Sequence, residues 1–325
     1  MKLARREFLR LAAGGVAIPF TSPIAWAQAY PTGPVRILVG FPAGGAVDVA
    51  ARVISPWLSE RLGQPFLVEN LPGESGNLAT RAVAKAPPDG STLLLCGPVN
   101  TINTILFQNL DFDFTRDIAP VASISRVPLV VEVNPTVEAR TVPEFLALAR
   151  AHPGRLKVAY AGRGTPQHIG IELFKMMAGV DLTLVPYLGS APALADLLNG
   201  QVDAMFDPMP SSIAHIRSGR LIPLAVTSPT RSEALPNVPA MSEFIPGYEA
   251  GSWYGIGAPK NTSDDVIRTL NREVNAGLSD PKIKARLADL SATAIPQSPA
   301  DFGSFIASET ERFATVIRTA RITGG

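Results

Sequence analysis

Two hydrophobic periods alternate along the chain, and turns rich in glycine and proline separate them. Residues 35–39 form a short apolar run rich in β-branched side chains, which predicts a strand. The turn 40–45 follows, and apolar residues between positions 49 and 58 then recur at the spacing of one helix face. The pattern predicts a strand, a tight turn and a helix, in that order.

The same unit recurs to the end of the chain. Further strands are expected at residues 65–70, 92–96, 156–160, 183–187, 202–206, 222–227 and 253–258. Helices are expected at residues 77–86, 142–152, 167–178, 264–276 and 299–319, with a further one ending at 199. This alternation is typical of α/β proteins, so we expect mainly parallel sheets flanked by helices, with the carboxyl ends of the strands on one edge.

The order of the elements also predicts two domains. Residues 121–133 are extended and β-rich but interrupted by Pro128, and we interpret them as a crossover between domains. We assign residues 28–127 with 252–325 to domain 1 and residues 128–251 to domain 2. A chain that leaves one domain, builds a second and returns is typical of hinged binding proteins, with a ligand cleft between the two lobes.

The turn after the first strand is a candidate anion site. Its residues are Phe41, Pro42, Ala43, Gly44 and Gly45. Glycine allows a ligand to approach the backbone closely, and the free N–H groups of a first helical turn bind anions without a charged side chain. We expect these amides to hold a ligand carboxylate, although a turn that merely links strand to helix explains the pattern equally well. The G-x-G-x-x-G and Gly-Lys-Ser/Thr signatures of nucleotide-binding loops are absent.

A second turn of the same design follows the strand at 156–160. Thr165 is a suitable N-cap, and Pro166 occupies the favoured first helical position. The candidate binding residues of this turn and the following helix are Gly162, Arg163, Gly164, Thr165 and His168.

Five further polar residues follow strand ends on the same predicted edge. They are Asn100, Thr101, Tyr187, Ser190 and Asp207. Tyr187 and Ser190 are candidate donors to the far end of a ligand. Asp207 is a candidate partner for a ligand ammonium or hydroxyl, or for His168 or Arg163, and a turn-forming Asp-Pro explains it equally well. Ordinary loop polarity also explains Asn100 and Thr101.

Composition narrows the function. Apolar residues make up 46% of the chain and charged residues 18%, as is usual for a globular protein. The net charge is +1, of which residues 1–27 contribute +3, so the remaining −2 does not favour nucleic-acid binding. Cys96 is the single cysteine, so neither an intramolecular disulfide nor a cysteine metal site is expected. No cofactor or metal is implied, and hydrolase signatures such as G-x-S-x-G and H-E-x-x-H are absent, so we expect no enzyme.

The N-terminus has the features of an export signal. Arg5 and Arg6 precede an apolar segment that is shorter than a spanning helix needs and is interrupted by glycine and proline. This pattern is typical of a twin-arginine signal, with cleavage after Ala27 or Ala29. We therefore expect a mature protein in the periplasm.

Seven motifs, in order along the mature chain, resemble the Bug-type solute receptors of the tripartite tricarboxylate transporter class. They occupy residues 41–48, 68–77, 84–94, 151–156, 185–203, 232–243 and 246–249. The resemblance implies a type II-like periplasmic binding protein with two lobes around a cleft. It also implies a monomeric receptor that binds a small carboxylate and delivers it to membrane permease subunits. The alternative is a ligand-loaded partner of a membrane sensor, and a periplasmic hydrolase is the least favoured.

The resemblance also implies where the ligand binds. One carboxylate would be held by backbone N–H groups of the loops 41–45 and 162–165, with His168 nearby. Arg163 departs from the small polar residues usual in the second loop, and it either holds a second carboxylate in bidentate fashion or carries a solvated charge. A dicarboxylate, a tricarboxylate or an aromatic acid would be the ligand.

Overall fold

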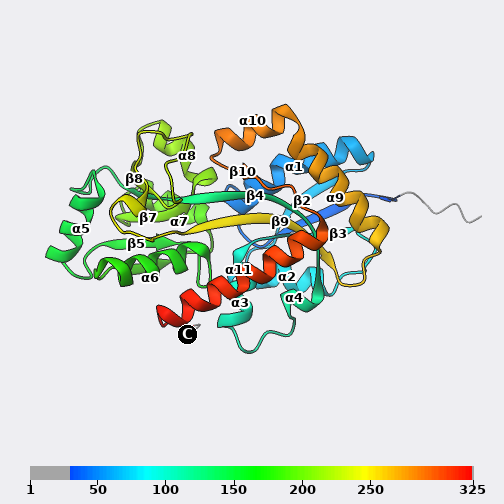
Figure 1. Cartoon of the computed structure of the whole chain (residues 1–325), viewed down its shortest axis with the longest axis horizontal. Helices are drawn as coiled ribbons and strands as arrows, with labels where there is room; N and C mark the ends of the chain where they lie inside the picture. Colours follow the sequence, from blue (N-terminus) through cyan, green and yellow to red (C-terminus); the bar gives the residue numbers. More distant parts are fainter. Residues whose placement is uncertain (1–29, 324–325) are drawn as a thin grey trace, which may run out of the picture.

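The computed structural model describes residues 30–323 as one long curled sheet with helices packed on its faces. Figure 1 shows the strands running along the length of the molecule, with helices on both sides. This arrangement confirms the predicted α/β class. The export signal predicted at residues 1–27 lies outside the described residues.

The sheet has the strand order β2-β1-β3-β9-β4-β7-β5-β6, and β8 and β10 also pair with β4. The strands are β1 Val35–Val39, β2 Phe66–Asn70, β3 Thr92–Cys96, β4 Ile118–Val133, β5 Lys157–Tyr160, β6 Thr183–Pro186, β7 Ala204–Pro208, β8 Ile222–Val226, β9 Gly251–Pro259 and β10 Thr293–Ala294. We refer to the part around β1, β2 and β3 as the β1 half and to the part around β5, β6 and β7 as the β5 half.

Parallel pairing is found within each half, where β1 pairs with β2 and β3, and β5 pairs with β6 and β7. These are the strands whose helical crossovers the sequence predicted. The central strands β4 and β9 run antiparallel to each other and connect the halves (Figure 1). The carboxyl ends of the parallel strands therefore face the middle of the molecule from both sides.

The predicted interruption at Pro128 is wrong, because β4 is one continuous strand of 16 residues. Pro128 is the last residue of β4 that pairs with β9, opposite Gly251, and Leu129 is the first that pairs with β7. A residue without an N–H group is tolerated at this junction, where one ladder ends and the next begins.

The helices are α1 Ala46–Leu62, α2 Asn77–Ala84, α3 Pro98–Leu106, α4 Phe114–Asp117, α5 Val142–Ala151, α6 Pro166–Ala178, α7 Ser190–Leu198, α8 Met209–Arg217, α9 Asp264–Ser279, α10 Pro281–Asp289 and α11 Pro299–Thr319, with the 3-10 turns η1 Glu74–Gly76 and η2 Met241–Glu243. The helices predicted from the sequence, α1, α2, α5, α6, α7, α9 and α11, lie close to their expected positions. Loop polarity was one explanation for Asn100 and Thr101, but both lie in α3, which begins at Pro98 because proline suits a first helical position.

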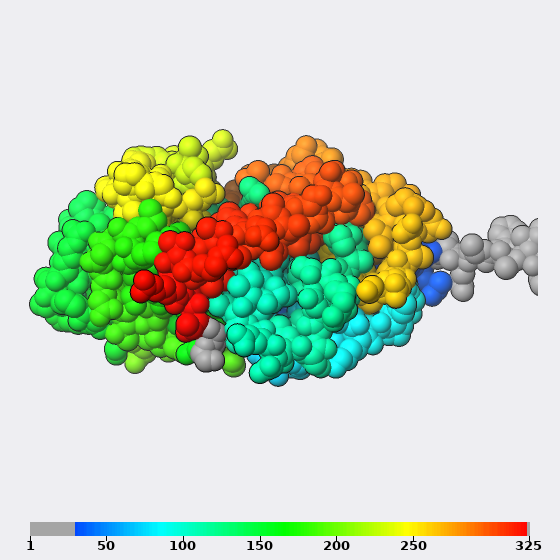
Figure 2. All heavy atoms as spheres, turned by 60° about the horizontal axis from the view of Figure 1, so that its bottom comes forward, coloured from blue at the N-terminus to red at the C-terminus, as the bar shows by residue number. Residues whose placement is uncertain are grey.

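The last helix, α11, crosses the surface from the β1 half toward the β5 half, as Figure 2 shows in red. Near its start, the fully buried ring of Phe302 meets the Trp253 indole edge-on, with the ring centroids 5.7 Å apart. Gly255 of β9 leaves room for this ring, since a Cβ there would overlap it. Near its end, Phe313 and Ile317 pack against apolar residues of α3 and α6.

We expect Phe302→Ala to lower the free energy of unfolding by about 3–5 kcal/mol, because it removes a fully buried aromatic ring. Urea unfolding followed by circular dichroism measures this loss. Phe244→Ala is the control, since Phe244 is 38% exposed and its loss should cost about 1 kcal/mol or less. Equal losses in the two variants would contradict the docking of α11 described above.

Candidate functional site

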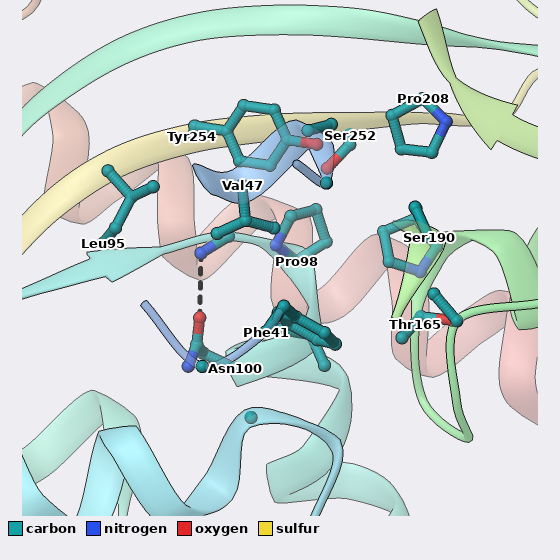
Figure 3. Close-up of a pocket in the computed structure, with 18 of the residues that line it drawn as sticks. Phe41, Val47, Leu95, Pro98, Asn100, Thr165, Ser190, Pro208, Ser252 and Tyr254 are labelled. Carbon is teal, nitrogen blue, oxygen red and sulfur yellow. Dashed lines mark hydrogen bonds between the residues drawn. The ribbon is translucent and has the colours of Figure 1, made fainter. Parts of the chain in front are cut away.

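A cavity lies where the two halves meet, with an empty volume of about 600 Å³ when the space that opens to solvent is included. Figure 3 shows Tyr254 and Ser252 on one side, Phe41 and Asn100 opposite, and Thr165 and Ser190 facing them from the β5 half. The residues that line it are Gly40, Phe41, Gly45, Ala46, Val47, Gly76, Leu94, Leu95, Gly97, Pro98, Val99, Asn100, Ala161, Thr165, Pro166, Gln167, Ser190, Pro208, Ser252 and Tyr254. None of these lining residues carries a charged side chain.

Four helices begin at this cavity. The N-cap residues of α1, α3 and α6 are Gly45, Gly97 and Thr165, and all three line it, as does Ser190, the first residue of α7. The first N–H groups of a helix have no partner within the helix, and the helix dipole places partial positive charge there. The cavity is therefore suited to an anion through backbone groups alone.

Local sequence explains why α3 and α6 begin where they do. In α6 the Thr165 hydroxyl accepts a hydrogen bond from the His168 amide, 3.4 Å away, and Pro166 follows as expected. In α3 the Asn100 side chain reaches back to accept from the Gly97 amide at 2.8 Å, the bond dashed in Figure 3. Its amide nitrogen donates to the Thr80 hydroxyl at 2.8 Å. Asn100 thus shapes the cavity wall.

The first glycine loop is held from within. Gly44, at φ +86°, donates its N–H to the Asp48 carboxylate at 3.0 Å, and Asp48 also accepts from Arg52 and Asn70. Burial opposes ionisation of Asp48, but these hydrogen bonds outweigh it and lower its pKa. The expected role of the Gly44 amide as a ligand donor is therefore not supported, because Asp48 occupies it. Phe41 and Gly45 line the cavity, whereas Pro42, Ala43 and Gly44 do not.

The second glycine loop also closes on itself. The Gly164 amide donates to His168 Nδ1 and the Thr165 amide to the Gly162 carbonyl, each at 3.4 Å. Gly162 and Gly164 have φ values of +101° and +72°, which explains why glycine occupies both positions. Of this loop, Thr165 lines the cavity, followed by the first residues of α6.

Arg163 and His168 are not brought to the cavity. The Arg163 side chain is exposed, lines a separate surface hollow and hydrogen-bonds Tyr160. The His168 ring stacks on Tyr160 at a centroid distance of 5.0 Å. Burial, with Arg163 and Lys175 nearby, lowers the pKa of His168 to about 4, so the ring is neutral at physiological pH.

Of the remaining candidate residues from the sequence, some lie at the cavity and others are engaged in bonds within the fold. Ser190 lines the cavity, and Asp207 lies directly behind it, with Ser190 Oγ 2.5 Å from Asp207 Oδ1. Asp207 has no bond to Arg163 or His168 among its described partners. The Thr101 hydroxyl donates to the Pro98 carbonyl within α3, and the Tyr187 hydroxyl donates to Asp196 at 2.7 Å, so both are engaged structurally.

Several lining residues were not predicted. Gln167 directly follows the recognised cap of α6, so its place in the first helical turn was a usable signal. Ser252 and Tyr254 lie in β9, where the sequence indicated only a strand. Their place at the cavity follows from the antiparallel pairing of β9 with β3 and β4, which no local pattern encodes.

The two halves are in contact around the cavity. A Cβ built on Gly189 would lie 2.6 Å from Pro42 Cδ, and one on Gly45 would lie 3.8 Å from Ser190 Cβ. Within residues 30–323, no cluster of three or more His, Cys, Asp or Glu side chains is arranged to hold a metal. The helices in this range also include none with the length and hydrophobicity to cross a membrane.

Comparison with known proteins agrees with this architecture. The family model of the tripartite tricarboxylate transporter family receptor matches residues 50–322. The protein BugT of Bordetella pertussis is 36% identical over 312 residues, which cover 95% of this chain and 94% of BugT.

Two solved structures have the same fold. R. palustris Rpa4515 with adipate gives a TM-score of 0.89 at 36% identity, covering 90% of this chain and 99% of that one. The periplasmic binding protein BugD gives 0.87 at 31% identity, with coverages of 90% and 99%. The expected two-lobed binding-protein fold is therefore confirmed, and the relatives are solute-binding receptors and not enzymes. The chain belongs to the tripartite tricarboxylate transporter receptor family.

Proposed function

We propose that this protein is a periplasmic receptor that captures a small carboxylate in the central cavity and delivers it to tripartite permease subunits in the membrane. The observation that carries the proposal is the convergence of four helix N-termini on a cavity lined by no charged side chain. The adipate in the related R. palustris structure supports a carboxylate ligand. The paired arginines near the N-terminus support export through the twin-arginine route.

The proposed binding mode follows from the two walls of the cavity. The first turns of α1 and α3 hold one ligand carboxylate from the β1 half, through the Ala46 and Val47 amides of α1 and the Val99 amide of α3. The first turns of α6 and α7 face the ligand from the β5 half. Leu94, Leu95 and Tyr254 supply an apolar wall suited to the methylenes of a dicarboxylate or to an aromatic ring.

Capture requires the halves to separate and close. We assign residues 28–127 with 252–325 to one lobe and 128–251 to the other. Because β4 passes from the first lobe to the second at Pro128 and the chain returns at Gly251, where β9 begins, this pair of crossings is the proposed hinge. The loops around Pro42 and Gly189 then meet when the lobes close over the ligand.

A thermal-shift screen of carboxylates tests the function. We expect at least one mono-, di- or tricarboxylate or aromatic acid to raise the melting temperature, because a ligand that binds only the folded state adds about 2.7 kcal/mol at 100 times its dissociation constant. Neutral sugars of similar size are the control. Stabilisation by sugars and by no carboxylate would refute the proposal.

Gly189→Ala tests closure. Gly189 has a φ of 170°, an extended conformation that alanine adopts freely, so the added methyl group meets only the opposite loop, where Pro42 Cδ lies 2.6 Å and Phe41 Cδ1 3.7 Å away. We expect ligand affinity to fall by roughly five- to 150-fold, because such overpacking costs about 1–3 kcal/mol in the closed form alone. Isothermal titration calorimetry measures the affinity.

Gly33→Ala is the matched control, since nothing lies within 4 Å of a Cβ at Gly33. Its affinity should equal that of the wild type. Unchanged affinity in Gly189→Ala would show that ligand capture does not bring these two loops together.

A further inference from the structure

Two carboxyl groups that the carboxylate site does not use are buried behind the cavity. Glu132 of β4 and Asp207 of β7 are both 0% exposed. The Ser212 hydroxyl of α8 lies between them, 2.6 Å from Glu132 Oε1 and 3.0 Å from Asp207 Oδ2. A negative charge on this pair would repel an anionic ligand. The protonation state of the two carboxyl groups therefore decides which ligands the nearby part of the cavity accepts.

The geometry favours one proton held by the pair. A hydroxyl has a single hydrogen, so Ser212 gives a full hydrogen bond to only one carboxyl group, and a proton on the other carboxyl group completes the second bond. Glu132 is the protonated member, because its second oxygen, Oε2, has no hydrogen-bond partner among the described residues. Burial and the nearby Asp207 raise the pKa of Glu132 well above its usual value.

Asp207 has more hydrogen-bond donors around it than Glu132 has. It lies within hydrogen-bond distance of the hydroxyls of Ser190, Ser211 and Ser212, and its Oδ1 is 3.5 Å from Gln167 Nε2. Burial raises its pKa to about 6 against the opposing effect of these donors. At neutral pH one negative charge therefore resides on Asp207.

The other charged groups near β7 are engaged elsewhere or solvated. Tyr254 of β9 is the further titratable group that interacts with Asp207. Lys157 of β5 and Arg217 of α8 are exposed to solvent. Tyr160 and His168 stack on each other, and Glu172 pairs with Lys175 within α6. Asp196 of α7 accepts a hydrogen bond from Tyr187, and His215 of α8 contacts Arg220. No cation among these groups neutralises Asp207.

Asp207 orients the polar groups of two side chains that line the cavity, Ser190 and Gln167. Ser190 directs its only hydroxyl hydrogen at Asp207, and Gln167 directs its amide nitrogen at Ser190 Oγ, 3.2 Å away, and at Asp207. What these side chains retain for a ligand is a Ser190 lone pair and the Gln167 carbonyl oxygen. Both are acceptors.

We propose that Asp207 determines which ligand group is accepted at the end of the cavity lined by Gln167 and Ser190. The backbone amides of α6 and α7 also begin here, but the side chains of this end select a hydrogen-bond donor: a hydroxyl, an ammonium or a protonated carboxyl group. A second ionised carboxylate enters only when a proton is taken up from solvent by Asp207 or by the ligand. The inference rests on the proposed function, in which the first carboxylate binds at the helix N-termini of the β1 half.

The sign of the pH dependence follows from this arrangement. A dianion beside ionised Asp207 raises the pKa of that carboxyl further, so the bound state holds more protons than the free state. Dicarboxylate affinity is then greatest below about pH 6 and falls as the pH rises, by up to about tenfold per pH unit. A monocarboxylate with a terminal hydroxyl takes up no proton, and its affinity stays constant.

Matched ligand pairs test the proposal. Calorimetric titrations at about pH 7 and about pH 8 would compare succinate with 4-hydroxybutanoate, adipate with 6-hydroxyhexanoate, and suberate with 8-hydroxyoctanoate. We expect the affinity of the dicarboxylates to fall by about tenfold between these pH values and that of the hydroxy acids to remain unchanged. Identical pH profiles for both series would overturn the proposal.

Two variants test whether the pH dependence of dicarboxylate affinity comes from Asp207. In Asp207→Asn the dicarboxylate slope should vanish, whereas Asp289→Asn, which removes a charge from an exposed position on α10, should retain it. A slope that persists in Asp207→Asn would overturn the proposal.

Infrared spectroscopy of the ligand-free protein tests the shared proton by itself. A protonated-carboxyl band should be present in the wild type at neutral pH and absent from Glu132→Gln. Absence of that band from the wild type would overturn this inference while leaving the receptor function intact. Failure of every acid in both series to bind, at either pH, would instead refute the receptor function.

Discussion

Unpaired amides at helix N-termini are the constraint around which this protein is built. A buried N–H group without an acceptor is costly, and here four helices direct their first turns into one enclosed space. The sheet makes this possible, because the parallel strands of each half end toward the middle of the molecule and each helix begins just beyond a strand end. A bound anion would satisfy groups that the fold leaves open.

Some of these amides bond the protein's own side chains, which reduces the number that could face a ligand. Asp48 occupies the Gly44 amide and is balanced by Arg52, so the first loop is rigid before any ligand arrives. Asn100 does the same for Gly97 in α3. The amides left for a ligand belong to the helical turns that follow Gly44 and Gly97. The hydrogen bonds from Gly44 to Asp48 and from Gly97 to Asn100 hold these turns in place.

Much of this arrangement was predictable from sequence because it is local. The strand-turn-helix units and the Thr165-Pro166 cap are encoded by neighbouring residues, and the structure has them at the predicted places. The hydrogen bond from the Gly44 amide to Asp48 could also have been predicted, since Asp48 follows four residues later in the first turn of α1. The positions of Tyr254 and Glu132 were not, because they depend on how β4 and β9 pair across the whole sheet. The loop sequence left open whether Arg163 reaches the ligand, and the structure places its side chain on the surface.

The end of α11 has a mechanical consequence. Phe313 and Ile317 pack against Ile102 of α3 and Ile169 of α6, so a single apolar cluster holds together helices from both sides of the cavity. Any movement that separates α6 from α3 must expose part of this cluster to water. If the lobes open to admit a ligand, this cluster favours the closed form, and the ligand needs to supply only the rest of the free energy of closing.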